Sequence, residues 1–155
     1  MTMRIRKAEG ERDLSFMLGL GQRLAAVIET ELHEQAEIQS FQDAFSAANL
    51  RDPAAGSLSL IAEDVVGVGL GFLHALPGAD GITGQKIGYV ALLAVTDAAE
   101  GTGVARQLLT AAEDWAREQG YAALSLDVFA SNHRGRNFYE KNGFAAETLR
   151  LVKKL

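Results

Sequence analysis

The chain has 155 residues, of which 48% are apolar and 23% charged, and its formal net charge is −5. These proportions are typical of a globular domain that can bury a core, so we expect a single domain over residues 1–155. Because the sequence contains no cysteine, a disulfide framework, a thiol nucleophile and a thiolate metal site are all excluded.

The first residues lack the apolar stretch of a secretory signal, and the longest apolar run, residues 65–73, is too short to span a membrane. We therefore expect a cytoplasmic protein without a membrane partner. The acidity lies in residues 1–78, whose net charge is −5, whereas residues 79–155 are balanced. This distribution argues against a nucleic-acid partner and favours the attraction of a cationic ligand.

The first half of the chain predicts a strand, two helices and a hairpin. Residues 3–8 alternate as an edge strand does, and residues 13–28 have helical spacing with Asp13 as the expected cap. A second, more polar helix is predicted over about residues 34–49, before a turn at Pro53 and Gly56. Three strands follow, and they are expected over residues 57–63, 65–74 and 86–95, with a tight turn at Glu63 and Asp64 joining the first two.

The second half alternates helices and strands. We expect a helix from about 103 to 119 that stops at Gly120, a strand over 121–129, a short helix that ends at Gly143, and closing strands over residues 144–155. The order βααβββαβαβ predicts an α/β (α+β) fold, in which a mixed sheet has helices on both faces.

A turn rich in small residues precedes the helix at 103–119. Gly101, Gly103 and Ala105 remove side-chain bulk at alternate positions of "EGTGVA". The first amides of a helix have no partner within the helix, so an anion that comes close can accept hydrogen bonds from them. The same residues are also consistent with a capped helix whose glycines only allow tight packing.

Two motifs together resemble the GNAT superfamily of acyl-CoA-dependent N-acyltransferases. Gly103 and Ala105 match the last two fixed positions of the family's motif Arg/Gln-x-x-Gly-x-Gly/Ala. Asn132 and, seven residues later, Tyr139 in "YEKNGF" match its second signature. The resemblance implies one N-acetyltransferase domain with the GNAT fold, a single mixed, mostly antiparallel sheet of six to seven strands.

The resemblance also implies the reaction: an acetyl group passes from acetyl-CoA (coenzyme A) to a primary amine of a small molecule or protein, by direct attack on the thioester and without a metal. Tyr139 would be the acid for the leaving sulfur; the alternative is an aromatic packing residue beside Phe138. Asn132 would bind the cofactor arm, cap a helix, or both. The remaining cofactor-binding positions carried over from the family are Leu93, Val95, Gly101, Thr102, Gly103, Val104, Ala105 and Arg106.

Glu100 departs from the family pattern, which has Arg or Gln at this position. A carboxylate near a diphosphate is repulsive unless it points to water, so the affinity for the cofactor is expected to fall. Arg106, Arg134 and Arg136 are candidates for the missing positive charge, or are ordinary exposed cations. The alternative function is therefore a non-catalytic acyl-CoA-binding module of the same fold.

No residue pattern in the sequence identifies a general base. The strand at 86–95 offers only Tyr89 as a proton-transfer residue, while His74 and the turn at Glu63 and Asp64 have no supporting pattern. We therefore expect a water relay.

Features outside the motifs bear on the partners. Glutamates at positions 29, 31, 34 and 37 favour a cationic acceptor or are simply a solvated face. Related proteins often dimerise through their closing strands, so the resemblance also allows a homodimer built on residues 148–155.

Overall fold

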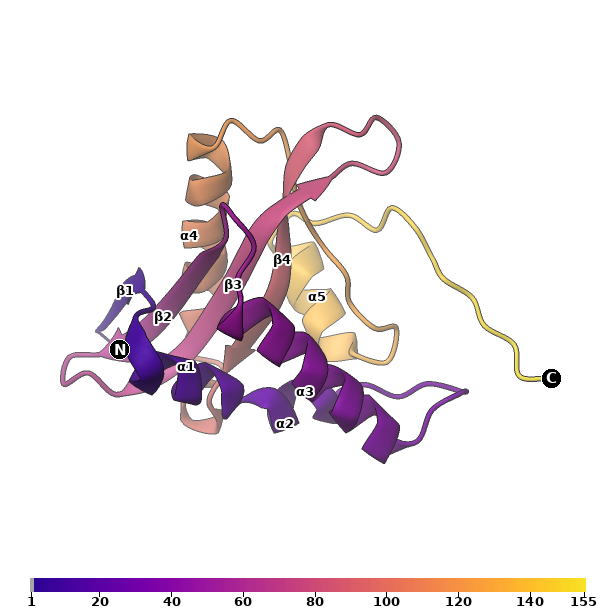
Figure 1. Cartoon of the computed structure of the whole chain (residues 1–155), viewed down its shortest axis with the longest axis horizontal. Coiled ribbons are helices and arrows are strands. Elements are labelled where there is room, and N and C mark those ends of the chain that lie inside the picture. Colours follow the sequence, from indigo (N-terminus) through magenta and orange to yellow (C-terminus); the bar gives the residue numbers. More distant parts are fainter. Residues whose placement is uncertain (1) are drawn as a thin grey trace.

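The computed structural model describes residues 2–155. These residues form one mixed sheet of five strands, in the order β1-β2-β3-β4-β5. Helices cover both faces of the sheet (Figure 1). The first three strand pairs are antiparallel and the last, β4 with β5, is parallel. The elements in chain order are β1 (Met3–Lys7), α1 (Gly10–Leu18), α2 (Gly21–Ala26), α3 (Gln35–Arg51), β2 (Leu58–Asp64), β3 (Gly69–Ala79), β4 (Lys86–Val95), the 3-10 turn η1 (Asp97–Ala99), α4 (Val104–Glu118), β5 (Leu124–Leu126) and α5 (His133–Lys141).

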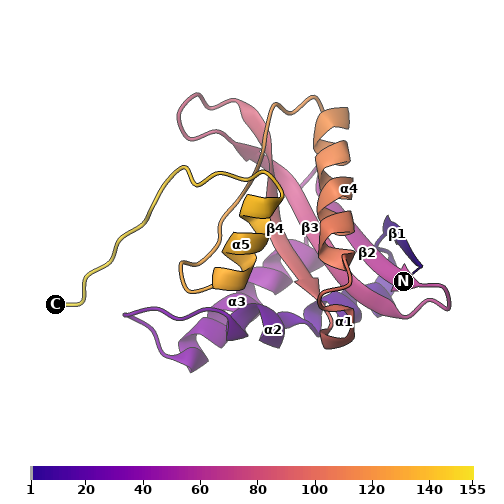
Figure 2. The same ribbon diagram turned by 180° about the vertical axis from the view of Figure 1, so that it is seen from behind.

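Two apolar layers hold the helices to the sheet. On one face, Leu108 and Leu109 of α4 pack with Leu73 and Val90 of the sheet, and α5 adds Phe138 at the margin. On the other face, residues of α1 and α3 pack against the sheet; the buried members of this layer are Met17, Leu20, Leu50, Ile61, Phe72, Leu92 and Ala94. Figure 2 shows α4 and α5 in front of the sheet and α1–α3 behind it. The mixed sheet with helices on both faces is thus confirmed.

The predicted helix over residues 13–28 is wrong in detail, because it is two helices. α1 ends at Leu18 and α2 begins at Gly21. Asp13 is not the cap; it lies inside α1, where its carboxylate accepts a hydrogen bond of 2.8 Å from the Glu9 amide. The second predicted helix is confirmed as α3, whose first turn is closed by a capping box between Glu34 and Glu37.

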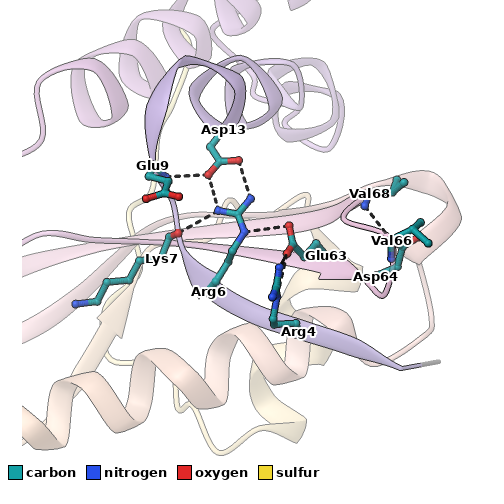
Figure 3. Close-up of polar contacts among 9 residues, drawn as sticks. All are labelled: Arg4, Arg6, Lys7, Glu9, Asp13, Glu63, Asp64, Val66 and Val68. Carbon is teal, nitrogen blue, oxygen red and sulfur yellow. Dashed lines mark hydrogen bonds and ion pairs between the residues drawn. The ribbon is translucent and has the colours of Figure 1, made fainter.

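Asp13 has another role, which is to fasten α1 to the sheet edge (Figure 3). The guanidinium of Arg6 on β1 donates to Asp13 at 2.6 and 2.9 Å and to the buried carboxylate of Glu63 on β2 at 3.0 Å. Arg4 makes a second ion pair with Glu63. The hydrogen bonds from these arginines hold the pKa of both carboxyl groups below their usual range.

The hairpin between β2 and β3 turns later than predicted. The Asp64 carboxylate accepts hydrogen bonds from the amides of Val66 and Val68, at 3.0 and 2.9 Å, so the turn occupies residues 64–68 (Figure 3). β3 consequently begins at Gly69 rather than at residue 65. The strand predicted over 86–95 is confirmed as β4.

The last part of the sheet differs most from the prediction. The strand expected over 121–129 is reduced to the three residues of β5, and residues 144–155 form no strand. The sheet therefore has five strands instead of six to seven, and the order is βαααβββαβα. A strand is stable only when it pairs with a neighbour, and in a single copy these last residues lie in extended conformation away from the sheet (Figures 1 and 2). None of the described helices has the length and apolar character needed to cross a membrane.

Candidate active site

Strands β4 and β5 separate after a short parallel contact. They pair only between Gly88–Val90 and Leu124–Leu126, so the β5-facing edge of β4 has no strand partner from Ala91 to Val95. A register shift opposite His74 and Ala75 places Ala91 as the extra residue of β4, and such a bulge bends the strand. The predicted binding residues Leu93 and Val95 lie on this unpaired stretch; the Val95 carbonyl already accepts a hydrogen bond from Arg23 of the neighbouring helix α2.

The turn that follows β4 leads directly into α4. Gly101 and Gly103 have φ angles of 74° and 88°, in the left-handed region that side chains disfavour. Gly103 is the N-cap of α4, and no side chain caps the helix. Within residues 2–155 the amides of Val104, Ala105 and Arg106 have no protein acceptor, so three donors point out of the helix end.

The space in front of this helix end is open. A Cβ placed on Gly101 or on Gly103 would have no atom within 4 Å. Beside it runs a shallow hollow of about 570 Å³ along α4, lined by Gly103, Arg106, Gln107, Thr110, Ala111 and Asp114. The hydroxyl of Thr102 donates to the Ala99 carbonyl and so fixes the turn. The arrangement fits a ligand with an anionic group at the helix end.

Glu100 does not point freely to water. Its carboxylate forms an ion pair with Arg134, from the first turn of α5, and lies 3.7 Å from the guanidinium of Arg23 on α2. Arg23 also donates to the Val95 carbonyl at 2.7 Å and pairs with Asp97. Two cations thus offset the charge of Glu100, and one of them, Arg134, was a predicted source of positive charge.

Asn132 is the N-cap of α5. Its side-chain oxygen accepts a hydrogen bond of 2.9 Å from the Gly135 amide. A Cβ on Gly135 would approach the Asn132 amide nitrogen to 2.5 Å, so the cap requires glycine there. The capping role is therefore observed, and the carboxamide nitrogen remains available for a ligand. Arg136 donates to the Ala130 carbonyl at 3.1 Å and steadies the same loop.

Tyr139 lies at the margin of the core, with its ring edge-on to Phe138 and Phe144 at centroid distances of 5.3 and 5.7 Å. Its hydroxyl makes no hydrogen bond to another group of residues 2–155. Burial raises the pKa of Tyr139 to about 12, so the phenol stays protonated over the working pH range. Tyr139 can therefore act as a hydrogen-bond donor.

A hydrogen-bonded pair of side chains, Tyr89 and Asp127, lies at the point where β4 and β5 separate, and the sequence did not predict this pair. The Tyr89 hydroxyl donates to the exposed Asp127 carboxylate at 2.8 Å, and Asp127 is the residue directly after β5. Because the neighbouring Gly88 packs on Trp115 and Ala116 of α4, Tyr89 points to the opposite sheet face. The one signal in the sequence was the position of Asp127 within the strand predicted over residues 121–129.

The other proton-transfer candidates are occupied or inaccessible. His74 is fully buried, its Nδ1 lies 2.7 Å from the Ser59 hydroxyl, and burial lowers the pKa of its imidazole. Glu63 is held by Arg4 and Arg6.

The acidic segment between α2 and α3 is partly structural. Glu34 and Glu37 form the capping box of α3, and the Glu29 amide donates to the Ser131 hydroxyl at 2.9 Å. This last bond ties the end of α2 to the loop before α5.

Comparison with known proteins agrees with the motifs. The model of the acetyltransferase (GNAT) family matches residues 18–144. The uncharacterized N-acetyltransferase YhfO of Bacillus subtilis (strain 168) is 31% identical over 118 residues, which are 76% of this chain and 77% of that protein.

Two solved structures show the same fold. A putative acetyl transferase from Pyrococcus furiosus has a TM-score of 0.80 and 22% identity, over 99% of this chain and 100% of that one. A predicted acetyltransferase from Clostridium acetobutylicum, solved with acetyl-CoA, has a TM-score of 0.66 and 21% identity, over 99% of this chain and 96% of that one.

Proposed function

The chain belongs to the acetyltransferase (GNAT) family, and we propose that it transfers an acetyl group from acetyl-CoA to a primary amine of a small molecule or protein. The observation that carries this proposal is the juxtaposition of the unpaired edge of β4 with the uncapped N-terminus of α4. An extended, amide-rich ligand fits the first, and an anion fits the second.

Acetyl-CoA has both features. Its diphosphate would accept hydrogen bonds from the amides of Val104, Ala105 and Arg106, with the Arg106 side chain beside it in the hollow along α4. Its pantetheine arm would lie along the edge of β4 at Leu93 and Val95. The Asn132 carboxamide, at the start of α5, would lie close to this arm. The thioester would then lie in the gap between β4 and β5.

The chemistry requires a neutral amine, a polarised carbonyl and a stabilised leaving sulfur. The amine nitrogen bonds to the carbonyl carbon and the carbon–sulfur bond breaks; the amine gives a proton to water, and the leaving thiolate takes a proton from water. Main-chain N–H near Leu93 would polarise the carbonyl. With a pKa of about 12, Tyr139 would give up its proton to a thiolate of pKa about 8.5 only at a cost of roughly 5 kcal/mol. We therefore assign Tyr139 to donating a hydrogen bond that stabilises the sulfur.

Asp127 is the group we assign to the incoming amine. Asp127 directly follows Leu126, which is the last residue of β5 to pair with β4, and the Tyr89 hydroxyl orients its carboxylate. An exposed carboxylate there can bind a protonated amine, and the proton of the amine can then pass to water. This arrangement favours a cationic acceptor on the sheet face opposite α4.

The test is to incubate the purified chain with acetyl-CoA and a panel of primary amines and to measure the release of CoA thiol. Turnover with at least one amine, reduced at least about ten-fold in Tyr139→Phe, supports the enzyme. The matched control is Tyr121→Phe, since Tyr121 also packs edge-on against an aromatic ring, that of Trp115. In Asp127→Asn the KM for the amine should rise, whereas Asp52→Asn, at the end of α3, should have no effect.

A second measurement on the same purified chain, its stabilisation by acetyl-CoA, distinguishes a binding module from an enzyme. Acetyl-CoA at 100 times its dissociation constant should stabilise a binder by about 2.7 kcal/mol. Stabilisation without turnover on any amine would indicate the non-catalytic module. The absence of both stabilisation and turnover would refute acetyl-CoA as the substrate.

A further inference from the structure

The face of the sheet that packs against α1–α3 is covered only in part. The buried layer under these helices includes Leu92 and Ala94 of β4 and, at its margin, Ala91. β3 and β4 continue past this point to Ala79 and Lys86, the ends of their hairpin. In Figure 1 this hairpin extends beyond the three helices. Part of this sheet face is therefore open to a ligand.

The open part of the face carries apolar side chains. Gly88 and Val90 of β4 face α4. Because side chains alternate along a strand, Ile87 and Tyr89 face the opposite side. Leu76 of β3 is the cross-strand partner of Tyr89 and shares this side. Within residues 2–155, neither apolar layer includes Leu76, Ile87 or Tyr89, and each of them is half-buried. We name these three side chains the apolar platform.

Helix α3 borders the platform with an aromatic side chain. α2 packs on one flank of α3, where a Cβ on Gly21 would lie 3.2 Å from the Asp43 carboxylate. Phe41 precedes Asp43 by two residues, which rotate a helix by about 200°, so Phe41 lies on the flank away from α2. Its ring stacks on that of Phe45 at a centroid distance of 5.9 Å, and Phe45 packs on the buried layer. In Figure 1 α3 runs between α2 and the open hairpin. Phe41, which is 52% exposed, therefore lies on the side toward the hairpin.

A carboxylate lies at the edge of the platform. Asp127 is exposed and accepts a hydrogen bond from the Tyr89 hydroxyl, its one side-chain donor among residues 2–155. Because this donor is neutral, the negative charge of Asp127 is free to attract a cation. Phe129, two residues further along, is 42% exposed. The loop that carries both residues is fixed, since the Ser131 hydroxyl donates to the Val27 carbonyl at 2.9 Å. The site thus combines one anionic group with a preorganised apolar surface.

Such a surface selects among amines. An ammonium group on an apolar chain or ring can pair with Asp127 and place its carbon skeleton on the platform, which removes apolar area from water. A second charge on the same skeleton would lie on apolar side chains without a partner, which is unfavourable. We propose that the preferred acceptor is a primary amine with an apolar body, an alkyl or arylalkyl amine, and that Leu76, Ile87 and Phe41 determine this preference. The proposal rests on the proposed acetyl transfer.

The first test compares linear alkylamines as acceptors. Ethylamine, butylamine and hexylamine have nearly equal basicity, so the series changes the apolar area and little else. We expect kcat/KM for acetylation to rise about two- to four-fold per added methylene that reaches the platform, and 2-phenylethylamine to exceed ethylamine at least about ten-fold. The matched competitor is 1,6-diaminohexane, which has the length of hexylamine and a second ammonium group. Its kcat/KM should be at least about ten-fold lower than that of hexylamine.

The outcomes separate this proposal from the acetyl transfer itself. Turnover that is independent of chain length would overturn the preference for an apolar body and leave the transfer reaction intact. A higher kcat/KM for 1,6-diaminohexane or for a lysine-containing peptide than for hexylamine would do the same. No turnover with any amine would overturn both proposals.

Two variants test whether the platform determines the preference. In Ile87→Thr the ratio of kcat/KM for hexylamine to that for ethylamine should fall at least about three-fold, because apolar area is lost while a β-branched residue is kept in the strand. The matched control is Ile5→Thr, the same change at a half-buried position of β1 in the layer under α4, which should leave the ratio unchanged.

The ratio is insensitive to partial unfolding. Both rates are measured on one preparation, so a lower fraction of folded protein affects them equally. Phe41→Ala, at an exposed position of α3, should lower the ratio as well. Equal ratios in wild type, Ile87→Thr and Phe41→Ala would refute the assignment of the preference to these residues.

Discussion

Replacement of Gly103 by alanine separates the structural role of this residue from its proposed role in binding. Its φ of 88° lies in the left-handed region, where an L-residue costs roughly 1–2 kcal/mol. For a domain of this size, such a loss lowers the melting temperature by roughly 2–8 °C. Since a Cβ at residue 103 would contact nothing within 4 Å, we expect no further loss from steric clash.

The effect on acetyl-CoA should be much larger than the effect on stability. The same Cβ would project into the open space before the amides of Val104, Ala105 and Arg106, where we place the diphosphate. We expect the dissociation constant for acetyl-CoA, measured by titration calorimetry at 25 °C, to rise at least about ten-fold, which corresponds to about 1.4 kcal/mol.

The chain supplies a matched control at the other end of the same helix. Gly120 follows α4, has a φ of 78°, and its added Cβ would likewise meet nothing within 4 Å. Gly120→Ala should therefore lower the melting temperature to a similar extent and leave the affinity for acetyl-CoA unchanged. If both variants bind acetyl-CoA equally well, the N-terminus of α4 is not the diphosphate site and the reasoning is wrong.

Three further changes test other parts of the structure. Glu100→Gln removes the carboxylate that Arg134 and Arg23 neutralise, so calorimetry should show acetyl-CoA binding about two- to five-fold more tightly; weaker binding would mean that the ion pairs shape the turn. Leu108→Ala, at a fully buried position, should lower the free energy of unfolding in urea by about 2–5 kcal/mol, and a smaller loss would indicate that the core collapses around the gap. Glu63→Gln tests stability in acid. Arg4 and Arg6 lower the pKa of the Glu63 carboxyl, so the ionised Glu63 stabilises the fold above the pKa of this group in the unfolded chain. This stabilisation is lost as the pH falls through the lower pKa of the folded state. The gap in melting temperature between wild type and variant should thus narrow below about pH 4, and a constant gap would contradict this linkage.

Local sequence determined the elements that carry the proposed cofactor site. The alternation of residues 86–95, the helical spacing after Gly103 and the small residues of the turn predicted β4, α4 and their junction, and the structure confirms these elements. Such features depend on contacts between residues close in the chain, so periodicity and glycine placement are sufficient to predict them. The capping of α5 by Asn132 was likewise predictable from its own segment.

Tertiary structure alone decided how distant charges meet. Glu100 was expected to repel an anion, but α2 and α5 bring Arg23 and Arg134 to it. Asp127 became a candidate for the amine because the parallel pairing of β4 with β5 places it beside Tyr89. No pattern in one stretch of sequence contains these distances.

The strands at the end of the chain show the same division. The closing strands predicted over residues 144–155 are absent, because a strand requires a partner and pairing is a property of the assembled sheet, not of alternation within one segment. The sequence therefore determined which segments can pair and which helix ends are left uncapped. Only the tertiary structure determined which edges find a neighbour and which charges are neutralised, because both depend on contacts between residues far apart in the chain.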